Sequence, residues 1–177
     1  MSKLTKGFIH VYTGNGKGKS TAAIGQAVRS AGCGLKSYML QFMKDFPYCE
    51  INSLKRFEDL ITVKQICNDD WVFKKVPAPE EEKLKARSAL SEAKEIMLKE
   101  EYDLIILDEV IVSIYFNLIN IEEVLDFISS KPERTELILT GRYCPEEIIQ
   151  KADLVTEMKE IKHYYQKGVI SRKGIDS

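Results

Sequence analysis

The chain has 177 residues, enough for one domain that buries roughly 70% of the surface exposed by its unfolded form. Its 26 Lys and Arg nearly balance 27 Asp and Glu, so the formal charge of -1 provides no electrostatic footprint for nucleic acid or an anionic membrane. No CxxC pair, signal peptide or apolar run of roughly 18 residues is present, which argues against a zinc site and a membrane span and favours a soluble cytoplasmic protein with reduced thiols.

Apolar runs rich in β-branched residues alternate along the chain with longer helical patterns. This rhythm is typical of a mostly parallel sheet covered by helices. The predicted strands are Phe8–Tyr12, Ser37–Phe42, Ile61–Ile66, Leu104–Leu107, Leu137–Leu139 and Leu154–Met158. Helices are predicted over 20–32, over 79–100 and from Pro145 onward. Because no linker or repeat divides the chain, we expect a single domain over residues 1–177.

The stretch "TGNGKGKST", Thr13–Thr21, follows the first predicted strand and opens the first predicted helix. It matches the phosphate-loop pattern GxxxxGK[ST] except that Thr13 stands where the first glycine is usual. Three later glycines let backbone N–H groups turn inward, Lys19 can reach phosphate oxygens, and the Ser20 hydroxyl can bind Mg²⁺. The alternative is a glycine-rich turn that binds nothing. The pattern in this context predicts a polyphosphate site.

The run "LIILDEV" delivers Asp108 and Glu109 at the end of a buried strand. In a parallel sheet, the carboxyl ends of the strands form the edge that binds ligands. Two carboxylates there can hold the magnesium ion that accompanies a polyphosphate. Alternatively, they are structural acids that cap the following segment. The phosphate loop favours the metal site.

Two arginines are further candidates for contact with a nucleotide. Arg142, in "LTGRYCPEEI", follows another strand at the same predicted edge, where its planar fork of donors could bind phosphate or a ribose hydroxyl. Arg142 could also be an ordinary surface residue. Arg29 lies near the end of the first helix, where an arginine commonly only complements the helix dipole.

The segment "ICNDDWVFKKVPAPEEE" carries Trp71 and Phe73. If this segment were extended, the two rings would point to the same side. They would then form either a hydrophobic anchor or one wall of a site for a large flat ligand, and spacing alone favours packing.

Several motifs together resemble one family. "TGNGKGKSTAA", "QFMK", "LDEV", "LTGRYCPEEIIQKADLVTEM" and "KHYYQKGVISRKGID" are similar to the ATP:corrinoid adenosyltransferases of the CobA/BtuR/CobO type, from about Gly7 to Asp176. The resemblance implies a P-loop NTPase-like (RecA-like) α/β fold with helices on both faces of the sheet. It also implies transfer of the 5′-deoxyadenosyl group of ATP to the Co(I) centre of a reduced corrinoid, cobalamin or a cobinamide-type precursor, with release of triphosphate.

The resemblance also implies roles for individual residues. ATP lies on the loop in reversed orientation, with Lys19 as the main charge partner of the triphosphate. The residues that correspond to triphosphate-binding positions are Gly14, Asn15, Gly16, Lys17, Gly18, Lys19, Ser20 and Thr21. Asn15 and Arg29 match positions near the nucleoside, and Arg142 is the further nucleotide-binding candidate. The resemblance assigns magnesium binding to Ser20 and Glu109, with Asp108 beside them.

The family uses aromatic rings to expel the lower axial ligand of Co(II) corrinoids, which gives Trp71 and Phe73 a predicted catalytic role. This sequence has the two rings in reversed order, Trp-Val-Phe where Phe-x-Trp is typical. Asp45 and Ser177 also depart from the family pattern. Only a few residues precede the first strand, so we expect no N-terminal helix over the site. A homodimer and a flavoprotein reductant are the protein partners that the resemblance suggests.

Two other functions fit the phosphate loop by itself. A P-loop ATPase or small-molecule kinase would use Asp108 or Glu109 to position a water or hydroxyl for attack on the γ-phosphate. A nucleotide-dependent switch would need loops that order around that phosphate.

Overall fold

The structure is a computed structural model that describes residues 4–44 and 48–176, so the departures at Asp45 and Ser177 lie outside the described residues. Its centre is a six-stranded sheet in the order β3-β2-β4-β5-β1-β6, in which every pairing is parallel. The strands are β1 (Ile9–Thr13), β2 (Ser37–Phe42), β3 (Ile61–Ile66), β4 (Leu104–Asp108), β5 (Glu136–Thr140) and β6 (Leu154–Glu157). The predicted parallel α/β fold is therefore confirmed.

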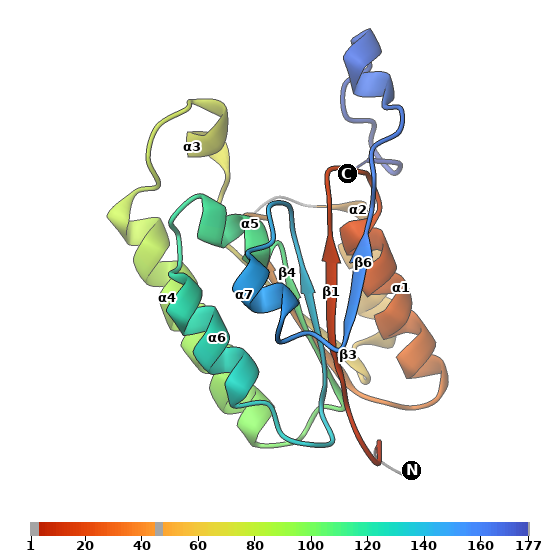
Figure 1. The fold of residues 1–177 in the computed structure, drawn as a ribbon. Helices are drawn as coiled ribbons and strands as arrows, with labels where there is room; N and C mark the ends of the chain where they lie inside the picture. Colours follow the sequence, from red (N-terminus) through yellow and green to blue (C-terminus); the bar gives the residue numbers. More distant parts are fainter. Residues whose placement is uncertain (1–3, 45–47, 177) are drawn as a thin grey trace.

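Helices cover both faces of the sheet (Figure 1). One face carries α1 (Lys19–Gly32) and α2 (Cys49–Leu54), and the other carries α4 (Glu80–Leu98), α5 (Val110–Tyr115), α6 (Ile121–Ser129) and α7 (Glu146–Ile149). Three short elements complete the fold: α3 (Asp70–Phe73) and the 3₁₀ turns η1 (Lys55–Phe57) and η2 (Tyr164–Lys167).

Each face of the sheet has its own apolar core. Ala23, Ala27 and Ala31 of α1 are buried against Met39 and other residues of the central strands. Their spacing of four residues places these small side chains on one stripe of the helix, which lets the helix lie close to the sheet. On the other face, α4 buries an apolar stripe made of Ala86, Ala89, Leu90, Ala93 and Met97, and Ile96 is partly buried beside it.

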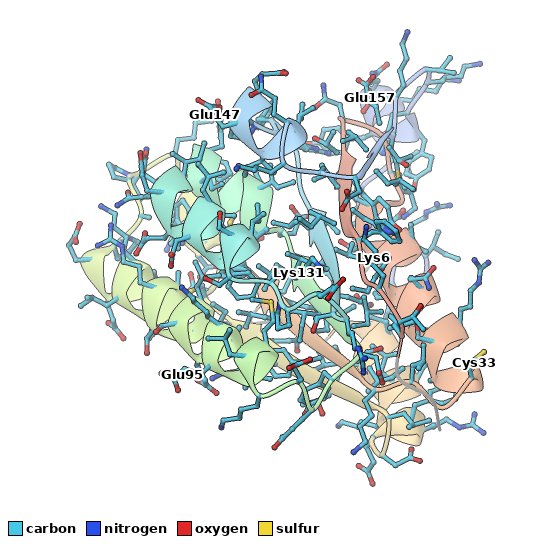
Figure 2. The ribbon with its side chains drawn as sticks, turned by 60° about the horizontal axis from the view of Figure 1, so that its bottom comes forward. Lys6, Cys33, Glu95, Lys131, Glu147 and Glu157 are labelled. Atoms are coloured by element: carbon cyan, nitrogen blue, oxygen red, sulfur yellow. The ribbon has the colours of Figure 1, made fainter. Side chains whose placement is uncertain are left out.

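The two edges of the sheet differ in what they carry. All strands run in one direction, so the loop after β1, the turn after β4 and the segment after β6 lie at the carboxyl edge, at the top of Figure 1. Figure 2 turns the opposite edge forward and shows Lys131 there. Its ammonium donates to the carbonyl oxygens of Gly7, Pro132 and Thr135 at 2.9 to 3.0 Å, which ties the entry of β5 to the N-terminal segment.

Within the described residues, no helix combines the length and the apolarity that crossing a bilayer would require. Among residues 4–44 and 48–176, no cysteine forms a disulfide, and the exposed Cys33 lies just after α1 (Figure 2).

Candidate nucleotide site

The loop between β1 and α1 is held against the chain that follows β6. The Gly16 N–H donates to the Met158 carbonyl at 2.6 Å. A Cβ at Gly14 or Gly16 would come within 2.6 or 2.5 Å of that same oxygen, and Gly14 has φ +94°, which side chains disfavour. These two glycines therefore permit a close backbone contact, and the N–H of Gly16 is used in that contact.

Lys19, the first residue of α1, is 6% exposed. Its ammonium donates to the Gly14 and Gly16 carbonyls, both at 2.8 Å, and so lies inside the curl of the loop. Burial lowers the pKa of Lys19, while the nearby Glu109 carboxylate opposes that shift. The charge lies at the start of a helix, where the backbone dipole also favours an anion.

A cleft of about 650 Å³ opens beside the loop. Eight residues predicted from the sequence line it: Gly16, Lys17, Gly18, Lys19, Ser20, Thr21, Glu109 and Arg142. Gly14 belongs to the same loop. The cleft thus brings several cationic side chains, a hydroxyl and a carboxylate to one space, an arrangement suited to a polyphosphate with a metal ion.

The C-terminal segment forms a wall of this cleft that the local sequence pattern does not reveal. The ammonium of Lys17 bonds the Ile175 carbonyl at 2.7 Å and the Asp176 carboxylate at 2.6 Å. Asp176 also accepts hydrogen bonds from the Tyr164 hydroxyl and, at 3.0 Å, from Nε of Arg172. The hydrogen bond from Lys17, followed in size by that from Tyr164, holds the pKa of Asp176 below its usual range.

Behind the cleft, the Asp108 carboxylate is fully buried. It accepts hydrogen bonds from Lys44 at 2.8 Å, from Gln41 at 3.0 Å and from the Thr140 hydroxyl at 2.6 Å. Burial alone would raise the pKa of Asp108, but the charge and hydrogen bond of Lys44 lower it overall. The same interaction outweighs burial at Lys44 and raises the pKa of the ammonium.

Sequence reasoning missed these three partners of Asp108. The available signal was a polar residue, Gln41, inside the apolar strand that Lys44 follows.

Glu109 differs from the preceding residue, Asp108, in its exposure and in the direction of its pKa shift. It has φ +62°, and its backbone N–H donates to the Thr140 hydroxyl at 2.9 Å, which fixes the sharp turn from β4 into α5. Its side chain is partly exposed and faces the cleft. Burial, followed by the charge of Asp108, raises the pKa of Glu109.

The residues present fit a magnesium ion. Ser20 and Glu109 offer hard oxygen donors to the same cleft, whereas Asp108 lies behind it and is already paired with Lys44. Among residues 4–44 and 48–176, no group of three or more His, Cys, Asp or Glu side chains could hold a metal. A magnesium ion in the cleft would therefore take its other ligands from phosphate oxygens and water.

Trp71 does not line this cleft. It lies on the short helix α3, so the extended segment considered from the sequence is not formed. The indole is 4% exposed, donates its N–H to the Asn68 carbonyl at 2.9 Å, and packs edge-on against Phe116 with 5.5 Å between ring centres. The side chain of Phe73 lies outside the described part of the chain.

Asn15 and Arg29 are both exposed and lie outside the lining of the cleft. Arg29 is in the last turn of α1, nine positions after Ser20, or roughly 14 Å along the helix axis. A contact of either residue with the nucleoside stays a prediction.

Comparison with known proteins shows the family of the chain. The profile of the family described as "ATP:corrinoid adenosyltransferase BtuR/CobO/CobP" matches residues 5–177. Similar proteins include a corrinoid adenosyltransferase of Escherichia coli K12, 33% identical over 97% of this chain and 86% of the relative. Another is the corrinoid adenosyltransferase CobA of Salmonella typhimurium, 31% identical over the same shares. A Sinorhizobium corrinoid adenosyltransferase is 33% identical over 97% of this chain and 80% of the relative. The resemblance seen in the motifs is confirmed, and the chain belongs to the ATP:corrinoid adenosyltransferase family.

Proposed function

We propose a division of roles in the cleft for the reaction that follows from family membership. That reaction is the transfer of the 5′-deoxyadenosyl group of ATP to the Co(I) centre of a reduced corrinoid, with release of triphosphate. The observation that carries the assignment is the cleft itself, in which Lys19, Ser20, Glu109 and Arg142 face one space beside the phosphate loop.

In this reaction the electron pair of Co(I) forms a bond to C5′ of ATP. The C5′–O bond breaks, and its electrons leave with the triphosphate. The protein then needs to hold the nucleotide in line with the cobalt and to stabilise the charge of the leaving group. We assign that stabilisation to Lys19 and Arg142, with the N–H groups at the start of α1.

Lys17 is a further candidate for phosphate contact. Its ammonium lines the cleft and is held by Asp176 of the C-terminal wall. We assign magnesium to Ser20 and Glu109, where the ion would neutralise part of the triphosphate charge.

We keep the assignment of Trp71 and Phe73 to the Co(II) corrinoid step as a proposal. The burial of Trp71 supports a packing role at least as well, so this assignment needs an assay that separates the two cobalt states. The preferred corrinoid, whether cobalamin or a cobinamide-type precursor, the flavoprotein reductant and the homodimer are likewise proposals that rest on the family resemblance.

Product analysis tests the assignment directly. The protein is incubated with MgATP and chemically reduced cobalamin, and the products are separated and identified. We expect triphosphate and light-sensitive adenosylcobalamin in equal amounts, with neither product from a Lys19→Ala variant. ADP and phosphate without an alkylcobalt product would contradict the assignment and point to a P-loop ATPase or kinase.

A further inference from the structure

Lys44 lies between the buried acid of the site and the phosphate loop. It lies two residues after the end of β2, and its side chain is nearly buried while still lining the cleft. Its ammonium is 2.8 Å from Oδ2 of Asp108 and 3.1 Å from the hydroxyl oxygen of Ser20. One cation therefore bonds both a strand-end carboxylate and the loop hydroxyl expected to bind magnesium.

The surroundings of Asp108 show why this cation matters. Gln41 and Thr140 also donate to the carboxylate, but both are neutral. Within the described part of the chain, Lys44 is the cation that donates to this fully buried acid. A buried carboxylate without a cation would leave a negative charge directly behind the phosphate site, where it would repel the nucleotide.

We propose that Lys44 is a positioning residue for the nucleotide: it neutralises Asp108, so that Ser20 and Glu109, without Asp108, receive the metal. The inference rests on the proposed function of the cleft as an ATP site. It assigns the two adjacent acids different tasks, Glu109 in the cleft and Asp108 in a neutral pair behind it.

The test compares ATP binding with and without magnesium, and it uses no corrinoid. The affinity of the full chain for ATP is measured by calorimetry in EDTA and again at saturating Mg²⁺. In the Lys44→Met variant the uncompensated Asp108 repels metal-free ATP more than MgATP. The ratio of the dissociation constant in EDTA to that at saturating Mg²⁺ should therefore rise about tenfold. This is the size expected for one charge acting across a partly solvated site.

Three further variants sharpen the test. Lys44→Arg keeps the charge and should keep the ratio within about threefold of wild type. Lys64→Met removes the cation of an exposed ion pair on β3 and should leave the ratio unchanged. The double variant Lys44→Met with Asp108→Asn removes both charges of the pair, so it should fold and bring the ratio back towards wild type.

Equal losses of affinity with and without magnesium in Lys44→Met would overturn the inference, because a purely structural role predicts that result. Loss of the magnesium effect in the double variant would also overturn it, since Asp108 would then be a direct metal ligand. If wild-type protein does not bind MgATP at all, the proposed function fails instead. The two failures are therefore distinguishable.

Discussion

The ammonium of Lys17 and the carboxylate of Asp176 lie 2.6 Å apart, although 159 positions separate them in the chain. Asp176 is also bonded to Tyr164 and Arg172, and the Arg172 guanidinium lies 4.6 Å from the centre of the Tyr164 ring. This cluster fastens the C-terminal segment to the phosphate loop. One side of the cleft therefore depends on an electrostatic contact between the two ends of the fold.

Replacing Asp176 by asparagine should loosen this wall. The variant keeps the shape but loses the charge that Lys17 and Arg172 share. We expect amide hydrogen exchange over residues 164–176 to become roughly 3 to 10 times faster and ATP affinity to fall by a similar factor. Exchange measured by mass spectrometry checks this, with Asp59→Asn, an exposed site before β3, as the control. Unchanged exchange over that segment would show that the ion pair does not hold the wall.

Gly16 in the phosphate loop and Gly25 within α1 provide a matched pair of variants. Gly16→Ala places a Cβ 2.5 Å from the Met158 carbonyl oxygen, so the loop or the chain after β6 must move. We expect a loss of about 1 to 3 kcal/mol in the free energy of unfolding, together with weaker ATP binding. Gly25→Ala, within α1 and with nothing within 4 Å of the new methyl group, should stabilise by about 0.5 to 1 kcal/mol. Urea unfolding measures both, and similar values for the two variants would be inconsistent with the close contact at Met158.

Trp71 can be tested as a packing residue and as a catalytic one. Trp71→Ala removes the ring that packs on Phe116 and should lower the free energy of unfolding by about 3 to 5 kcal/mol. Trp71→Phe keeps a ring and suits the kinetic test. If Trp71 acts on the lower ligand, this variant should slow the reaction that starts from Co(II) at least about tenfold more than the reaction that starts from Co(I).

The control for Trp71 is Phe127→Leu, a change at a fully buried ring of α6 in the same apolar core. It should affect stability without separating the two reactions. Equal losses from Co(II) and Co(I) in Trp71→Phe would leave Trp71 with a packing role alone.

The stability contributed by Glu136 should depend on pH. Its carboxylate bonds the His10 ring at 2.7 Å and the Phe8 N–H at 2.7 Å. Burial alone would raise the pKa of Glu136, but these bonds lower it overall. A depressed pKa in the folded state stabilises the protein above the unfolded value, about 4.3, and this contribution is lost as the pH falls through the lower folded value.

Glu136→Gln should therefore cost about 1 to 2 kcal/mol at pH 7, and the difference from wild type should shrink below about pH 4. Urea unfolding at the two pH values provides the measurement, with the exposed Glu58→Gln as control. If the difference in the free energy of unfolding is as large at low pH as at pH 7, the charge of Glu136 is not the source of this stability.

Local patterns predicted much of the fold because each depends on neighbours in the chain. The apolar runs at Ser37–Phe42 and Ile61–Ile66 match β2 and β3 in both bounds. The helices α5 and α6 were not predicted, because a short apolar run cannot be assigned to a buried strand or a buried helix by periodicity alone. The capping box of Asn120 and Glu123 was the local signal that α6 begins there.

The sequence by itself determined the parallel α/β fold, the phosphate loop and the family, because strand runs, glycine spacing and motif order are local properties of the chain. Only the tertiary structure decided which acid faces the cleft. Asp108 pairs with Lys44 because β2 and β4 are neighbours in a register that aligns Gln41 with Asp108. The tertiary structure also decided that Asp176 meets Lys17. Because β6 lies beside β1, the chain that follows β6 returns over the phosphate loop. Contacts of this kind depend on strand order and register, which no spacing within one segment encodes.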